Sequence, residues 1–349
     1  MVTEQPNQSD FNACLAAAVG HQIGTPQAVS VPAACPFSAF VCQVRLPPGC
    51  RPPAGSMGFR IGGGVALERE CARRLCLIEG IERYSLQYQA GDPERFRSRE
   101  IAGAADAEFS AADVLLGHPG RDAVFGLTDS RGCAAGSCIV DAAIRALLEL
   151  VEFGAIDRWR GGNEDFRTAT PADPQIMAIG NWLKTRNKVQ KFAQWRHPGG
   201  ATVAIALTCN RDGRHPALGS AARLDPQAAF AHASLESAFA SLNLAEIDRR
   251  NRDDADLSPA DRETLAVYRG EIALPPLALP RKSETGIARG TEDRALDGDG
   301  MKMLERLIAN LPEPLAILDL SRSETGIAVA RAILLPAANP RLERHTETF

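Results

Sequence analysis

Two glutamates, Glu79 and Glu82, are the first residues in this chain whose type and spacing indicate chemistry. The stretch 68–88 is predicted to form a helix, and both glutamates fall on its apolar face, because residues three and four apart are helix neighbours. Burying an unpaired carboxylate on such a face costs several kcal/mol, roughly. A divalent cation would compensate both groups. The alternative is an ion pair with a nearby arginine: Arg73, Arg74 or Arg83.

A second predicted helix, over 139–160, carries the same spacing. Glu149 and Glu152 stand three residues apart among apolar neighbours, and the glycine-containing stretch G-C-A-A-G-S precedes the helix. An ion pair between Arg145 and Glu149 is the simpler interpretation, and an exposed pair of this kind contributes only ~0.3–0.5 kcal/mol. The recurrence of glycine, helix and E-x-x-E favours a shared ligand site instead.

A third predicted helix opens at Asp225 and Pro226, which are favourable N-cap and first-turn residues, and it carries Glu236. A lone glutamate among small residues is usually solvated. Ahead of the first helix, 62–64 is a run of three glycines, and such a run is able to bring backbone N–H groups near an anion. No Gly-Lys-Ser/Thr follows, so the run is not a P-loop, and a plain turn is the simpler prediction.

Composition excludes several classes of function. The chain has 349 residues, 45% of them hydrophobic, and a net charge of −4, so it has no basic field for nucleic acid. No stretch approaches the ~18 apolar residues of a membrane helix, and the N-terminus lacks the basic region of a signal peptide. Nine scattered cysteines without a C-x-x-C pair favour reduced thiols in a cytoplasm over a zinc site.

Shorter elements separate the three helices. We expect strands over 42–46, 201–208, 316–320 and 327–335, and helices over 176–188 and 301–311. The charged segment 249–299 is predicted to be a long exposed connection. This alternation predicts a mixed α/β (α+β) domain with a central sheet and with the three glutamate helices lining one cleft. The hexapeptide S-E-T-G-I-A, at 283–288 and 323–328, is too short to define a repeat architecture.

Taken together, the motifs resemble those of the YcaO family. The resemblance depends on the glycine run before E-G-I-E-R-Y (79–84), on the G-C-A-A-G-S, E-L-V-E and A-I-D-R-W strings within 132–159, and on G-S-A-A-R-L-D-P-Q-A-A-F and L-E within 219–236. It implies a YcaO-like domain over 56–340. The remaining residues would form an N-terminal segment, 1–55, packed on that domain, and a short C-terminal tail, 341–349.

The resemblance also implies ATP held through Mg²⁺, which accepts hard oxygen ligands shared with phosphates. The metal positions would be Glu79, Glu82, Glu149, Glu152 and Glu236. The nucleotide contacts would be Arg83, Ser137, Asp141, Arg145 and His232. In the family's chemistry a nucleophile attacks a peptide carbonyl, ATP phosphorylates the resulting oxyanion, and the phosphorylated oxygen leaves.

The chain departs from the family pattern at several positions. The usual E-x-x-E-R-D of the second helix has Phe153 and Gly154 after its second glutamate, and His232 replaces an arginine one turn before Glu236. Leu75 replaces a serine, and Ser137 and Asp141 replace an asparagine and a glutamate. The sequence has no proline-rich C-terminal tail of the kind found in azoline-forming members.

Two functions therefore stay open. One is ATP- and Mg²⁺-dependent modification of a peptide backbone amide, by cyclodehydration or a related activation, in maturation of a ribosomally made peptide such as a thiazole- or oxazole-modified bacteriocin. The other is a scaffold with a degenerate ATP site that presents a precursor peptide to a partner enzyme. Expected partners are that peptide and a cyclodehydratase partner, flavin dehydrogenase or TfuA-type protein, without nucleic acid or membrane. A homodimer is also possible, and a likeness limited to the fold would leave a function unrelated to peptides.

Overall fold

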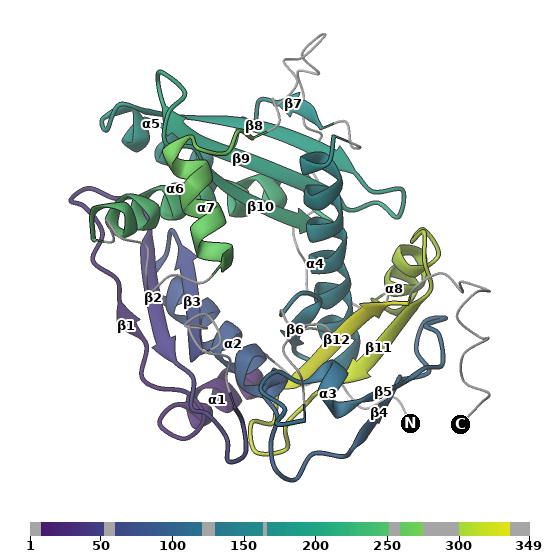
Figure 1. Cartoon of the computed structure of the whole chain (residues 1–349). Helices are drawn as coiled ribbons and strands as arrows, with labels where there is room; N and C mark the ends of the chain where they lie inside the picture. The colour runs from purple at the N-terminus through teal and green to yellow at the C-terminus, as the bar shows by residue number, and fades with distance from the viewer. Residues whose placement is uncertain are drawn as a thin grey trace.

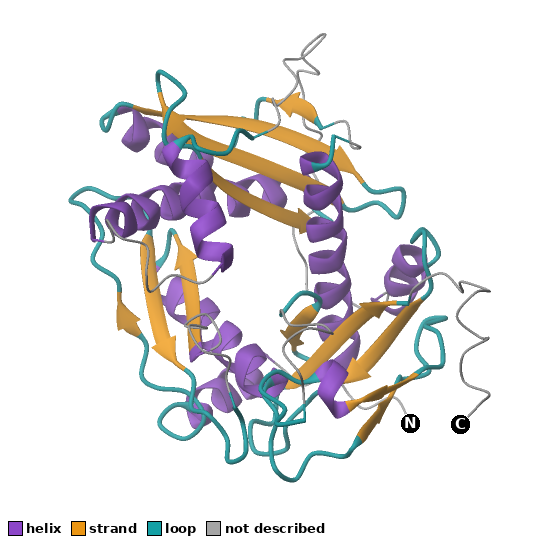
Figure 2. Cartoon of the chain, in the orientation of Figure 1, coloured by secondary structure: helices purple, strands orange, loops and turns teal. Residues whose placement is uncertain are grey.

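Among the residues that the structure describes, three sheets of three or four strands each end in an edge strand that leads directly into a long helix, and a two-stranded hairpin forms a fourth sheet. The computed structural model describes residues 8–51, 60–120, 130–162, 166–250, 259–274 and 300–335. Helices and strands alternate along the chain, so the mixed α/β class is confirmed (Figure 2). The strands form separate sheets, however, and not one central sheet.

The first sheet belongs to the N-terminal part of the chain. It has the antiparallel order β1 (Gln27–Ala28), β2 (Ser38–Gln43), β3 (Ile61–Ala66). Strand β3 leads into α2 (Arg69–Leu86), and α1 (Gln8–Ala18) packs on that helix. The predicted strand over 42–46 is therefore displaced, because β2 begins at Ser38 and ends at Gln43.

The second sheet joins segments from the middle and the end of the chain. Its antiparallel order is β11 (Leu315–Asp319), β12 (Ala328–Leu334), β6 (Cys133–Gly136). Strand β6 leads into α4 (Ile139–Arg160), whose bounds match the predicted helix, and α8 (Gly300–Ile308) packs on α4. Along the chain, a small hairpin and one helical turn follow α2 and precede β6. They are β4 (Arg95–Arg97), β5 (Glu108–Ser110) and α3 (Ala111–Val114).

The third sheet has the antiparallel order β10 (Ala217–Arg223), β9 (Thr202–Asn210), β8 (Lys188–Arg196), β7 (Arg167–Ala169). Strand β10 leads into α6 (Pro226–Arg250), and α5 (Pro174–Lys184) packs beside it. A further helix, α7 (Pro259–Arg269), lies in the segment predicted to be an exposed connection. Leu265 and Tyr268 on α7 are buried, so that prediction was wrong over α7.

Close backbone packing explains why the edge strands contain glycine. A Cβ at Gly64 would lie 2.2 Å from the carbonyl oxygen of Ala72 in α2, and a Cβ at Gly219 would lie 2.3 Å from the amide nitrogen of Ser237 in α6. The glycine run 62–64 is thus part of β3, and the predicted turn there was wrong. Figure 1 shows the three sheets spaced around the molecule with α2, α4 and α6 among them.

Two large apolar cores hold these layers together. One packs α2 against α1 and the second sheet, and its members include Leu15, Cys76, Ile81, Val329 and Ile333. The other packs α4 between the second and third sheets, and its members include Leu147, Ile156, Val203, Leu304 and Ile317. All nine cysteines are free thiols, as predicted. Within the described ranges, no helix has the length and apolarity needed to cross a membrane.

Candidate functional site

Each of the three larger sheets forms a unit with the long helix that follows it. In each unit, a backbone N–H of the edge strand donates to a glutamate sixteen residues later. The Gly63 nitrogen lies 2.8 Å from Glu79 Oε2, and the Ser220 nitrogen lies 3.3 Å from Glu236 Oε2. In the middle unit, the backbone of Cys133 makes the corresponding hydrogen bond to Glu149. The three units therefore present one glutamate each by the same local geometry.

The second glutamate of each E-x-x-E pair reaches the edge strand of the next unit. Glu82 Oε1 accepts from the Ala135 nitrogen at 2.8 Å. Glu152 accepts from the Ala222 nitrogen at 3.0 Å and from the Ser220 hydroxyl at 2.7 Å. Unpaired N–H groups on a sheet edge normally invite pairing with another chain. Here carboxylates satisfy them, and the same bonds join α2 to β6 and α4 to β10.

The third unit lacks such a second glutamate. The residue three positions after Glu236 is Phe239, which packs in an apolar cluster with Val65 of β3 and with Phe37, Leu67 and Trp182. The junction between α6 and the first sheet is therefore apolar. The series of five glutamates begins in the first unit and ends in the third.

Electrostatic repulsion links the five predicted metal positions in a series from Glu79 to Glu236. Burial raises the pKa of Glu82 to about 7, and the charge of Glu79 raises it further. Burial also holds the pKa of Glu149 well above its ordinary value, with added repulsion from Glu82 and Glu152. The pKa of Glu152 is raised by burial and by the charge of Glu236. The fold thus brings together every glutamate that the sequence singled out.

Arg83 is the cation at the centre of the first two glutamate pairs. Its Nη2 donates to Glu79 Oε1 at 3.1 Å, which is the ion pair considered from the sequence. Burial opposes the charge of this guanidinium, but Glu79, Glu82 and Glu149 together raise its pKa above the ordinary value. Arg83 therefore offsets part of the negative charge without matching all of it.

The predicted nucleotide contacts on α4 form a hydrogen-bonded row at the start of the helix. Asp141 Oδ2 accepts from the Ser137 nitrogen at 2.9 Å and from the Ser137 hydroxyl at 3.1 Å. Arg145 Nε donates to Asp141 Oδ1 at 2.8 Å, which is an i,i+4 ion pair that was not considered from the sequence. On α6, His232 Nε2 lies 3.1 Å from Glu236 Oε1. These side chains thus share contacts with one another or with the glutamates.

Sequence reasoning missed two side chains of the site, both on β10. Ser220 donates to Glu152 and, through its nitrogen, to Glu236. Arg223 is half-buried, and its charge opposes the rise in the pKa of Glu152. Both belong to the string G-S-A-A-R before the third helix. The sequence feature that could have identified them is a hydroxyl and a cation close to the glycine of an edge strand.

The donor set fits Mg²⁺ that is shared with phosphates. Among the described residues, no three His, Cys, Asp or Glu side chains form a ready-made metal cage. Mg²⁺ does not need one, because it usually takes one or two carboxylates, several waters and the phosphate oxygens of a nucleotide. Mutually repelling carboxylates with raised pKa values are the environment that such a cation would stabilise.

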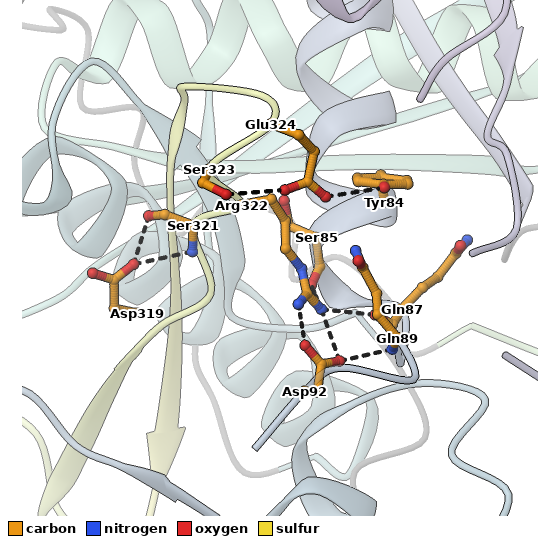
Figure 3. Close-up of polar contacts among 10 residues, drawn as sticks. All are labelled: Tyr84, Ser85, Gln87, Gln89, Asp92, Asp319, Ser321, Arg322, Ser323 and Glu324. Atoms are coloured by element: carbon orange, nitrogen blue, oxygen red, sulfur yellow. Dashed lines mark hydrogen bonds and ion pairs between the residues drawn. The ribbon is translucent and has the colours of Figure 1, made fainter. Parts of the chain in front are cut away.

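The turn between β11 and β12, in which the second copy of the hexapeptide begins, contacts the C-terminal end of α2 (Figure 3). Arg322 pairs with the buried Asp92 and donates to the carbonyl oxygens of Ser85 and Gln87, which are left without helical partners at the end of α2. The Tyr84 hydroxyl lies 3.1 Å from Glu324 Oε1. This turn between β11 and β12 therefore fixes the helix that carries Glu79 and Glu82. The first copy, 283–288, lies outside the described residues.

Comparisons with known structures agree with this architecture. The YcaO protein of Methanopyrus kandleri bound with AMPPCP and Mg²⁺ matches with a TM-score of 0.64 and 16% identity over 94% of this chain and 90% of that one. A heterocyclase in complex with substrate and cofactor matches with a TM-score of 0.68 and 15% identity over 93% of this chain. The chain spans about half (51%) of that heterocyclase. A chain of the Escherichia coli microcin synthetase McbBCD complex matches with a TM-score of 0.59 and 11% identity, over 88% of this chain and 87% of that one.

Sequence comparison supplies the family. A search of curated proteins found no match. The family model described as YcaO cyclodehydratase, ATP- and Mg²⁺-binding, matches residues 109–334, which is well over half of the chain. This match includes the glutamates of α4 and α6, and the structural likeness extends the fold to α2 and the first sheet. The chain therefore belongs to the YcaO family.

Proposed function

We propose that this protein binds ATP with Mg²⁺ and uses it to activate a backbone amide of a peptide. The observation that supports this proposal is the convergence of five glutamates from three units, with raised pKa values at Glu82, Glu149 and Glu152. A cluster of half-buried carboxylates is unfavourable without a cation. Membership of the YcaO family identifies Mg²⁺ and ATP as the ligands to test first.

The chain's own residues would bind and orient the nucleotide. Bound Mg²⁺ would neutralise charge on the carboxylates and phosphates. Each glutamate is held by a strand N–H on one oxygen, which fixes the direction of the other ligand positions. Arg83, Ser137, Asp141, Arg145 and His232 would be the nucleotide contacts in this proposal. Positioning and charge stabilisation are the main requirements of phosphoryl transfer. Residues that hold the metal and the phosphates would supply both.

The substrate in this proposal is a precursor peptide. Its amide carbonyl is attacked by a nucleophile, the oxygen that becomes negatively charged takes the γ-phosphoryl group, and the phosphorylated oxygen leaves. Ribosomal peptide maturation is the setting that fits this chemistry, and thiazole or oxazole formation in a bacteriocin is one form of it. A cyclodehydratase partner, a flavin dehydrogenase or a TfuA-type protein would then act on the same peptide.

A scaffold that presents the peptide without using ATP is the second candidate. His232 and Phe153 favour it, because they stand where the family pattern has arginines. In the structure, the Arg131 guanidinium lies 4.8 Å from the centre of the Phe153 ring, and His232 contacts Glu236. Neither position therefore offers a guanidinium of its own to a phosphate.

Calorimetry with ATP and Mg²⁺ tests the proposal and separates the two candidates. The unaltered chain should bind MgATP, and Glu149→Gln or Glu236→Gln should weaken binding by at least about tenfold, the loss typical of one charge-assisted contact. Glu108→Gln, at an exposed glutamate paired with Arg95, is the matched control and should bind as the unaltered chain does. Absence of saturable binding by the unaltered chain would favour the scaffold.

A further inference from the structure

Arg223 differs from the other cations of the site in having no acidic partner. Each of the other cations forms an ion pair with an acidic side chain four residues away on the same helix. The pairs are Arg83 with Glu79, Arg145 with Asp141, and His232 with Glu236. Arg223 forms no ion pair within the part of the chain that the structure describes, and its one hydrogen bond is to a carbonyl.

The backbone fixes Arg223 at the edge of the glutamate cluster. It is the last residue of β10, and its Nη1 donates to the carbonyl oxygen of Ala222 at 2.8 Å. The nitrogen of the same Ala222 donates to Glu152, and Ser220 of the same strand contacts both Glu152 and Glu236. The side chain is half-buried, and its positive charge acts on Glu152.

A half-buried guanidinium with no carboxylate at ion-pair distance is only partly compensated, because burial removes water and Glu152 acts on it from a longer distance. A planar guanidinium also has the donor geometry that matches phosphate oxygens in a bidentate contact. A nucleotide in this site would add several negative charges next to five carboxylates. Arg83 and Arg145 are already engaged with acids, so a further positive charge would be needed beside the phosphates.

We propose that Arg223 binds the polyphosphate of the nucleotide, and that it supplies from strand β10 the guanidinium which His232 does not supply from α6. This inference rests on the proposed function, because it takes ATP as the ligand. It assigns a phosphate-binding role to a residue outside the motifs on the helices. It also explains how a chain with histidine at position 232 retains a phosphate-facing arginine.

The test compares nucleotides with different numbers of phosphates, measured by calorimetry with Mg²⁺. Arg223→Gln should weaken ATP binding by at least about tenfold, whereas AMP binding should change less than about threefold. Arg223→Lys should recover part of the loss, because it keeps the charge without the fork. The control is Arg214→Gln, which alters an exposed arginine paired with Asp212 in the β9–β10 turn of the same sheet. It should bind both nucleotides as the unaltered chain does.

Thermal unfolding without nucleotide separates binding from folding. Without nucleotide, Arg223→Gln should unfold at about the same temperature as the unaltered chain, because the substitution breaks no ion pair, while the rise in unfolding temperature on adding MgATP should shrink. ATP affinity equal to that of the unaltered chain, or an equal loss for ATP and AMP, would overturn the inference and leave the proposed function standing. No MgATP binding by the unaltered chain would overturn both.

Discussion

Glu82 is the residue whose ionisation should be easiest to observe. Its pKa is about 7 in the folded chain, against an ordinary value of 4.5, so the folded state holds this proton more tightly than the unfolded state. The resulting stability is fully present below pH 4.5 and is lost as the pH rises through about 7. Without metal or nucleotide, the free energy of unfolding should therefore fall between pH 5 and 8. Denaturant titrations across this range measure it.

Glu82→Gln should reduce that pH dependence and leave the part that Glu149 and Glu152 contribute. The glutamine keeps an oxygen that accepts from the Ala135 nitrogen but carries no titrating proton. The charged groups facing position 82 are Glu79 and Arg83 on α2 and Arg145 and Glu149 on α4, and the variant leaves all four in place. Glu108→Gln is the control and should keep the slope of the unaltered chain. A slope in Glu82→Gln equal to that of the unaltered chain would assign the titration to other groups.

Sequence reasoning found the five glutamates and the ion pair between Arg83 and Glu79, but not the backbone groups that hold the glutamates. Carboxylates on apolar helix faces are a local signal, so Glu79 and Glu149 stand out in one sequence. Their partners are backbone N–H groups, which no residue type reveals. Two of these bonds also join distant positions, because Ala135 lies 53 residues from Glu82 and Ala222 lies 70 residues from Glu152. Such contacts depend on how the sheets assemble.

At the scale of elements, the long helices were predictable and the short strands were less so. Helix α4 has a continuous apolar face, an aspartate in its first turn and arginines in its last turn, all of which favour helix locally. The glycine run of β3 has the opposite character, since glycine is depleted in strands and common in turns. It forms a strand because only glycine allows α2 to lie against that backbone.

Gly64→Ala tests this explanation. The added methyl would overlap the Ala72 carbonyl and the Cys76 nitrogen of α2, which are backbone atoms that cannot rotate away. Overpacking of this kind costs about 1–3 kcal/mol and sometimes more. We expect a loss of free energy of unfolding in that range, with weaker MgATP binding, because displacement of α2 breaks the hydrogen bond between Gly63 and Glu79.

Gly180→Ala is the matched control for that substitution. Gly180 lies within α5, and a Cβ there meets no atom within 4 Å. Alanine should therefore raise the free energy of unfolding by about 0.5–1 kcal/mol through its better helix propensity. If Gly64→Ala were as stable as Gly180→Ala, close packing would not be the reason for glycine in β3.

At the scale of the whole molecule, three units of edge strand and helix surround one polar site. The sequence pattern indicated recurring glycine, helix and glutamate, but it did not reveal that β12 from the end of the chain pairs with β6 from the middle. Such pairing joins residues such as Val329 and Ala135, and local periodicity has no information about it. The closing junction, between α6 and the first sheet, also escaped prediction, because it replaces a carboxylate with an apolar cluster.

Phe37→Ala tests whether that apolar junction holds the third unit to the first. Phe37 is 2% exposed and meets the Trp182 ring edge-on, with centroids 5.5 Å apart. Truncating a buried phenylalanine typically costs about 3–5 kcal/mol, and denaturant unfolding should show a loss of that size. Because this junction contains no glutamate, MgATP affinity should change less than about threefold. Phe153→Ala, at a half-buried ring on α4, should cost less stability. A loss below about 1 kcal/mol in Phe37→Ala would mean that this apolar junction does not hold the third unit to the first.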